Sequence, residues 1–165
     1  EDLVLVEAIA DRAALALDNA LAHARQRTVS LHLQQALLPE ALPQPDSLQL
    51  AARYRPAGPS QLAGGDWYDA IEAPDGRLVL CVGDVVGHGL PAVGVMAQAS
   101  GAVRAYVCDG YGPGDVLTRL ARLLGSAGGL ATAVVASLDR ATGVLEYANA
   151  GHPLPLLRHP DGTID

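Results

Sequence analysis

The sequence predicts an α+β protein in which a long N-terminal helix precedes an antiparallel sheet. Residues 1 to about 38 contain neither Gly nor Pro and are rich in Ala and Leu, a composition that favours helix. Beyond them, strand-like segments stand before and after two helical segments, without the strict alternation of a doubly wound fold. Half of the 165 residues are hydrophobic, so a packed core is expected, and because Phe is absent Leu, Val and Ala must fill it.

The N-terminal helix carries a heptad pattern over its second half. Spacings of four and three residues alternate, as in a coiled coil, at Leu17, Leu21, Ala24, Thr28, Leu31, Gln35 and Leu38. The polar residues Thr28 and Gln35 weaken this seam. The pattern predicts either a homodimer through this helix or a helix packed on its own domain, and both readings remain open.

The second predicted domain follows a proline-rich connector. Pro39, Pro43 and Pro45 end the helix, which places a helical linker in residues 1–44 and the domain in residues 45–165. Two helices are predicted inside this domain, from Pro91 to Val107 and from Pro113 to Leu124, where Gly125 is placed to end the second. Strand composition, bounded by turn residues, is found in residues 48–54, 67–73, 78–84, 131–138, 144–149 and 154–158. The turn at 139–143 makes a hairpin of two of these strands.

Charge and cysteine content exclude several classes of protein. The net charge is −7 and the eleven basic residues are scattered arginines, so no basic footprint for nucleic acid exists. No apolar run reaches the ~18 residues of a membrane span, and the start lacks the basic flank of a signal peptide. Cys81 lies in an apolar run that predicts a buried, inert thiol, and it is too far from Cys108 for a Cys-x-x-Cys site. A cytoplasmic protein that binds neither nucleic acid nor membrane is expected.

Two segments place an aspartate beside glycine at the end of a strand. They are residues 64–69, GGDWYD, and residues 83–89, GDVVGHG. Glycine allows a sharp turn and a close approach to a ligand, and a carboxylate beside exposed carbonyls gives the oxygen-only environment that Mg²⁺ and Mn²⁺ prefer. Two ordinary tight turns would give the same pattern, because Asp is a common turn residue. The residues alone leave both readings open.

These segments resemble the stage II sporulation protein E and stress-response regulator branch of the bacterial PP2C-like (PPM-type) serine phosphatases. The match covers residues 33–165 through residues 33–39 (LQQALLP), 64–69, 83–89 and 147–153 (YANAGHP). Separately, residues 8–27 resemble the closing helix of a GAF sensor domain. The resemblance implies a β-sandwich flanked by helices and a role in signal transduction during stress.

The resemblance also implies a metal centre and a reaction. Asp66 and Asp84 would be the first carboxylates of a centre of two Mn²⁺ or Mg²⁺ ions, and Val85 would offer its backbone carbonyl. Water activated by two metals would hydrolyse phosphoserine or phosphothreonine on a regulatory protein, usually an anti-sigma-factor antagonist. Gly65, directly before Asp66, and Asp69, three residues after it, are possible further residues of the site, and Asp69 would either orient a metal-bound water or be solvated. His88 would either donate a proton to the leaving oxygen or serve the turn, and His152 is expected to be structural.

The sequence departs from the family's pattern in two ways. Further metal-binding aspartates should follow the turn at residues 150–153, whereas the chain stops at Asp165, so this fragment is expected to be inactive by itself. Residues 56–65 also contain no arginine to hold phosphate, and Arg53 and Arg55 would either meet the phosphate or face solvent. A catalytically inactive, phosphatase-like binding module with a dimerising helix is the alternative function. The presence of both Asp66 and Asp84 favours the enzyme.

Overall fold

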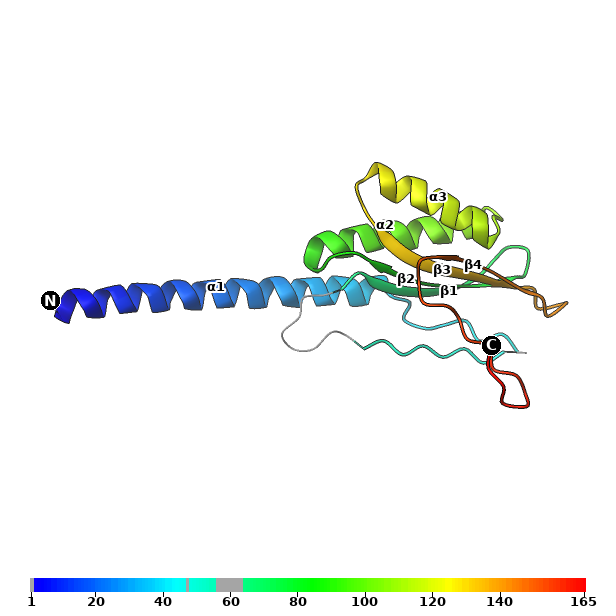
Figure 1. Ribbon diagram of the computed structural model, residues 1–165, viewed down its shortest axis with the longest axis horizontal. Helices are drawn as coiled ribbons and strands as arrows, with labels where there is room; N and C mark the ends of the chain where they lie inside the picture. Colours follow the sequence, from blue (N-terminus) through cyan, green and yellow to red (C-terminus); the bar gives the residue numbers. More distant parts are fainter. Residues whose placement is uncertain (1, 47, 56–63) are drawn as a thin grey trace.

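A computed structural model describes residues 2–46, 48–55 and 64–165 of the chain (Figure 1). Its elements are, in order, α1 (Asp2–Leu37), β1 (Asp66–Glu72), β2 (Leu78–Val85), α2 (Gly89–Cys108), α3 (Pro113–Ser126), β3 (Ala131–Leu138) and β4 (Leu145–Ala150). This arrangement confirms the α+β class and the long N-terminal helix. No helix in these ranges has both the length and the apolar character that crossing a bilayer requires.

The strands form one four-stranded antiparallel sheet in the order β1-β2-β3-β4. The chain turns between β1 and β2 where the amide of Ala73 bonds the carbonyl of Arg77 at 2.8 Å. The predicted hairpin of β3 and β4 is confirmed, and the amide of Asp139 bonds the carbonyl of Val144 at 2.9 Å across its turn. The helices α2 and α3 connect the two hairpins. Both lie on the same face of the sheet (Figure 1).

The core lies between this face and the two helices. Alternate residues of the strands, such as Trp67, Cys81 and Val135, are buried against apolar residues of α2 and α3. Burial raises the pKa of the Cys81 thiol to about 12, in keeping with the inert thiol predicted from the sequence. Gly83 in β2 lies under the ring of Trp67, since a Cβ added to this glycine would be 2.2 Å from the indole.

The other face of the sheet is open and partly apolar. Val82, Leu145 and Tyr147 are exposed, and the residues after α1 and after β4 pass along this side (Figure 1). The resemblance implies a sandwich of two sheets, but the described residues form only the sheet above. The domain boundary near residue 45 stays a prediction.

Two predicted strands are wrong. In the described residues 48–55, backbone pairing is replaced by a side chain, because the Gln44 amide bonds both the carbonyl of Leu50, at 2.8 Å, and its N–H, at 3.2 Å. Residues 154–158 contribute an isolated bridge between Arg158 and Ile164, where the chain folds back on itself. Pro153 and Pro155 lack the N–H that a continuous ladder needs.

The predicted helix boundaries need small corrections. The second predicted helix, α3, continues through Gly125 to Ser126, because a single glycine inside a helix costs little when its neighbours are packed. The first, α2, begins at Gly89, two residues before Pro91, with His88 at its N-cap. Pro91 therefore still lies in the first turn, as predicted.

Among the described residues, helix α1 is buried against the rest of the molecule near its C-terminal end, and its N-terminal part extends away from the sheet (Figure 1). Ser30 and Gln34 are buried there, and Leu31 and Leu38 pack against the core. Leu17, at the start of the seam, is exposed. The end of the helix is thus packed on its own domain, while the dimer predicted for the rest of the seam stays a prediction.

Candidate active site

Asp66 and Asp84 face each other across the β1–β2 ladder. Asp66 is the first residue of β1, and its register partner in β2 is Asp84. Both side chains are exposed on the open face, because the alternate residues Trp67 and Val85 are buried on the helix side. The expected proximity of the two carboxyl groups is therefore observed. Their roles in catalysis and metal binding stay predictions.

A glycine next to each aspartate allows this approach. A Cβ at Gly65 would be 2.4 Å from the carbonyl oxygen of Val85, so a larger residue would push the two strands apart. The amide of Val85 donates to the carbonyl of Gly65 at 3.2 Å, which extends the pairing past Asp66. Gly83 admits Trp67 on the opposite face. The glycines of both sequence motifs thus serve close contact between β1 and β2.

The electrostatics of the pair match a site for cations. Partial burial raises the pKa of Asp66, and the charge of Asp84 and a hydrogen bond between the two side chains raise it further, while His152 lowers it. Two adjacent carboxylates repel each other, and a divalent cation between them would remove this repulsion. The donors are all oxygens, two carboxylates and the nearby carbonyl of Val85, which suits Mg²⁺ or Mn²⁺. Within the described ranges, no cluster of three or more His, Cys, Asp or Glu side chains suited to a metal is found.

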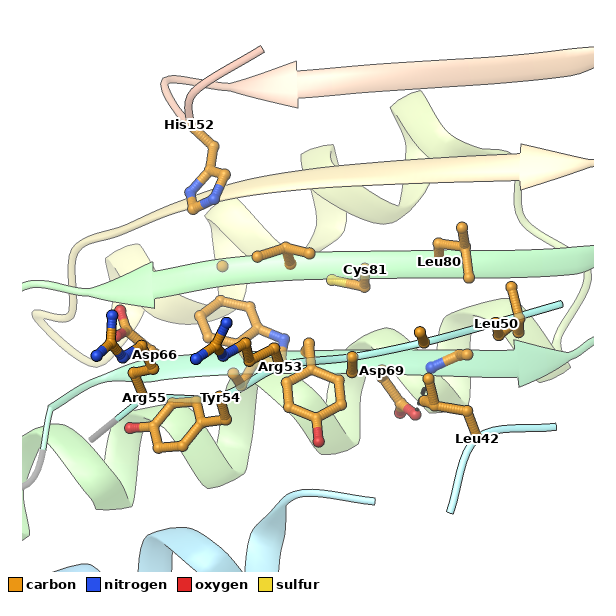
Figure 2. Close-up of a pocket in the computed structure, with 17 residues that line it drawn as sticks. Leu42, Leu50, Arg53, Tyr54, Arg55, Asp66, Asp69, Leu80, Cys81 and His152 are labelled. Carbon is orange, nitrogen blue, oxygen red and sulfur yellow. Dashed lines mark hydrogen bonds between the residues drawn. The ribbon is translucent and has the colours of Figure 1, made fainter. Parts of the chain in front are cut away.

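A cavity of about 470 Å³ opens beside Asp66 on the same face (Figure 2). It is lined by residues of β1 and β2, by residues 50–55 and by His152. Arg53 and Arg55 both belong to this lining, and Figure 2 shows Arg55 next to Asp66. Two guanidinium groups therefore lie at the cavity that contains the candidate metal ligand.

His152 is held in the lining by the turn after β4. Its Nδ1 lies 2.9 Å from the hydroxyl of Thr132, and Asn149 bonds both its N–H, at 2.8 Å, and its carbonyl, at 2.7 Å. Thr132 is the register partner of Asp84 in β3. The structural role expected of His152 is consistent with these bonds, which also place its ring on the cavity.

Asp69 and His88 are not brought to the carboxylate pair. The Asp69 carboxylate is buried, and both of its oxygens lie 2.7 Å from Nη2 of Arg104 in α2, so it is not solvated. His88 is exposed at the N-cap of α2 and lines a separate hollow with Gly87 and Leu130. Neither arrangement gives these residues a contact with Asp66 or Asp84.

Two residues that contact this site were not predicted from the sequence. Gln34 of α1 is buried and donates from Nε2 to the backbone carbonyl of Asp66 at 3.3 Å. Tyr54 lies close enough to Asp66 and Asp84 for both charges to raise its pKa. The heptad pattern had placed Gln35, not Gln34, on the inward side, whereas the LQQALLP stretch contains both.

Comparison with known proteins identifies the class. The chain whose sheet and helices are described above is a member of the PP2C-like serine phosphatases. Residues 74–165, more than half of the chain, match the family described as stage II sporulation protein E (SpoIIE). The chain belongs to the SpoIIE family.

Two relatives illustrate this membership. The chain is 28% identical over 125 residues to the phosphoserine phosphatase RsbP of Bacillus subtilis (strain 168), an alignment that covers 72% of this chain and 30% of RsbP. It is 42% identical to a chain in the crystal structure of the RsbU and RsbW domains of Rv1364c from Mycobacterium tuberculosis, with a TM-score of 0.59, covering 67% of this chain and 31% of that one. The chain therefore spans about a third of the length of each relative.

Proposed function

We propose that the protein containing this chain hydrolyses phosphoserine or phosphothreonine on a regulatory protein, with Mn²⁺ or Mg²⁺ as cofactor. The observation that carries the proposal is the pair of facing carboxylates, Asp66 and Asp84, at the strand ends of a SpoIIE-family chain. The relative RsbP is named as a phosphoserine phosphatase, which supports the same chemistry here. The 165-residue chain alone is expected to be inactive, because two carboxylates are too few to balance two dications.

Some residues of the site would bind the cations, and others would bind the phosphate group. Asp66 and Asp84 would hold the cations with their carboxylates, and Val85 would add its carbonyl oxygen. Divalent ions supply Lewis acidity toward phosphoryl oxygens and lower the pKa of water. Arg53 and Arg55 would place positive charge at the cavity for the phosphate group of the substrate.

The substrate we propose is a phosphorylated signalling protein such as an anti-sigma-factor antagonist. This choice rests on the SpoIIE family and on the stress-regulator relatives that the chain resembles. A folded phosphoprotein needs an accessible site, and both Asp66 and Asp84 are exposed. A sensor domain upstream of α1 would supply the signal.

The test is turnover of a phosphoserine protein by the full-length enzyme with Mn²⁺. Asp66→Asn and Asp84→Asn are each expected to lower the rate by more than about 100-fold, because each removes a direct metal ligand. Asp75→Asn is the matched control, since Asp75 lies in the β1–β2 turn and bonds Arg77. Full Mn²⁺-dependent turnover by both site variants would contradict the proposal.

A binding module without activity is the second candidate. It is favoured by the finding that the described residues contain no cluster of three metal-ligating side chains. In that case the full-length protein would bind the phosphoprotein without turnover, and Asp66→Asn would leave the binding constant unchanged. Phosphate release measured beside binding distinguishes the two functions.

A further inference from the structure

An imidazole lies at the cavity beside Asp66. The chain has five histidines, all within the described residues, and His152 is the one that lines this cavity. Figure 2 shows its ring directed from the turn after β4 toward the neighbouring strands. His88, the histidine considered as a proton donor from the sequence, lines a separate hollow at the start of α2. The histidine at the cavity is therefore the one for which only a structural role was expected.

The position of His152 follows from a row of residues across three strands. Asp66 in β1 is the register partner of Asp84 in β2, and Asp84 is the register partner of Thr132 in β3. Directly opposite residues point to the same face of a sheet, so Thr132 lies on the open face in line with the two carboxylates. Neighbouring strands are about 4.8 Å apart, so an imidazole bonded to Thr132 stands about one strand from Asp84 and two from Asp66.

The turn after β4 fixes both the backbone and the ring of His152. Asn149 accepts from its N–H at 2.8 Å and donates to its carbonyl at 2.7 Å. Gly151 has a φ of 72°, a left-handed conformation that favours glycine, and forms an isolated bridge with Ala133 of β3. The hydroxyl of Thr132 lies 2.9 Å from Nδ1 of the ring. The orientation of the imidazole over the sheet is thus set by three separate contacts.

The bond to Thr132 leaves the second ring nitrogen available to a substrate. Among the described residues, Nε2 of His152 has no hydrogen-bond partner, because the contact with Thr132 uses Nδ1. When the Thr132 oxygen accepts from Nδ1–H, Nε2 is the nitrogen at which the ring gains and loses a proton. The contact therefore orients the ring and also selects the nitrogen that can transfer a proton in the cavity.

His152 is near enough to the carboxylate pair to interact with it electrostatically. The pKa of Asp66 is raised by burial and by Asp84, and the charge of His152 lowers it. Arg53 and Arg55 belong to the lining of the same cavity. One cavity thus combines carboxylate, guanidinium and imidazole groups, which suit a cation, a phosphate group and a proton transfer respectively.

We propose that His152 is a catalytic residue that donates a proton from Nε2 to the leaving serine oxygen, and that Thr132 is its positioning residue. The oxygen of water forms a bond to phosphorus while the bond between phosphorus and Oγ of the substrate serine breaks. The proton on Nε2 moves to Oγ, and a proton of the attacking water then returns to Nε2. The products are serine and phosphate, and the histidine is restored. The inference rests on the proposed function and adds the proton donor to it.

The experiment compares two substrates of the full-length protein with Mn²⁺, a phosphoserine protein and p-nitrophenyl phosphate. The serine oxygen needs a proton to leave, whereas p-nitrophenolate leaves as a stable anion. His152→Gln is expected to lower kcat by about 100-fold or more for the phosphoserine protein and by less than about threefold for p-nitrophenyl phosphate. His159→Gln is the matched control, because His159 lies 2.7 Å from Asp165 at the exposed end of the chain and neither rate is expected to change.

Variants of Thr132 separate positioning of the ring from folding. Thr132→Val removes the hydroxyl and keeps the shape of the side chain, whereas Thr132→Ser keeps the hydroxyl. We expect Thr132→Val to lower kcat for the phosphoserine protein about tenfold, the effect of one lost hydrogen bond, and to leave kcat for p-nitrophenyl phosphate nearly unchanged. Thr132→Ser is expected to retain both rates. This pair also tests the inference if His152→Gln does not fold, because His152 stays in place.

Three results would overturn the inference. One is a folded His152→Gln variant whose rates for the two substrates are unchanged or fall equally. Another is a selective loss of phosphoserine turnover in His88→Gln instead. The third is weaker Mn²⁺ binding by His152→Gln in calorimetry, which would make the histidine a metal ligand. In each case the native protein is active and Asp66→Asn loses turnover of both substrates, so the proposed function survives. A native full-length protein that hydrolyses neither substrate overturns the inference and the proposed function together.

Discussion

The ring of Trp67 in β1 occupies the space that a side chain of Gly83 in β2 would need. A Cβ at Gly83 would lie 2.2 to 2.6 Å from three ring carbons. The two residues are register partners, one position inward from the pair of Asp66 and Asp84. The packing on the helix side of the sheet and the candidate site on its open face are thus set by neighbouring residues of the same two strands.

We expect Gly83→Ala to be strongly destabilising. The added methyl group meets a buried aromatic ring that cannot move aside, so a loss of about 3 kcal/mol in the free energy of unfolding is expected. Urea unfolding followed by Trp67 fluorescence measures it. Gly94→Ala in α2 is the matched control, because nothing lies within 4 Å of the added Cβ, and a gain of roughly 0.5 to 1 kcal/mol is expected there. Equal stability of both variants would contradict this account of the packing.

The ion pair of Asp69 and Arg104 ties β1 to α2. The Asp69 side chain is 4% exposed, whereas that of Arg104 is 53% exposed, so solvent screens part of the attraction. Arg104→Met leaves a buried carboxylate without its partner, and we expect it to cost about 2 kcal/mol. Arg122→Met on the exposed side of α3 is the control, with no measurable change expected. Chemical denaturation measures the free energy of unfolding of both variants. A similar small loss of stability in each would show that the ion pair contributes little.

Removal of metal ions should reveal the repulsion between Asp66 and Asp84. The pKa of Asp66 is raised above 3.8, so its contribution to stability is complete below that pH and is lost as pH rises through the raised value. In EDTA at pH 7, Asp66→Asn is therefore expected to melt higher than the native protein, with the difference shrinking toward pH 4. Excess Mn²⁺ is expected to reverse the order, because under the proposed function only the native pair would bind the ion. A native protein that is the more stable of the two in EDTA at pH 7 would rule out this electrostatic picture.

The exposed seam of α1 predicts a dimer. Thr28 bonds Ala24 within its own helix at 3.1 Å, and Gln35 is exposed, so leucine at both positions would extend the apolar seam that begins at Leu17. We expect Thr28→Leu with Gln35→Leu to tighten dimers of the full-length protein about tenfold. Analytical ultracentrifugation measures dimerisation, and the phosphatase rate is followed in parallel. Tighter dimers with an unchanged phosphatase rate and metal dependence would show that dimerisation of the helix does not influence the metal site.

Local sequence patterns determined a large part of this protein. The absence of Gly and Pro predicted α1, and alternating apolar residues predicted four strands to within about a residue, because both signals depend on the chain itself. Glycine beside Asp66 and Asp84 indicated a sharp turn or a close approach to a ligand, and the structure adds that both glycines allow close contact between β1 and β2. These features depend on backbone conformation and on neighbours in sequence.

Only the tertiary structure decided which residues meet. Residues 48–54 have strand composition, yet a strand requires a partner, and the Gln44 side chain satisfies Leu50 instead. The heptad favoured Gln35, while the docking of α1 buries Gln34, one position away, and carries it to Asp66. Asp69 belongs to the same motif as Asp66, but the alternation of β1 turns it to the helix side, where Arg104 holds it. Contacts between segments distant in sequence settle such choices, since their energies depend on packing that no single segment contains.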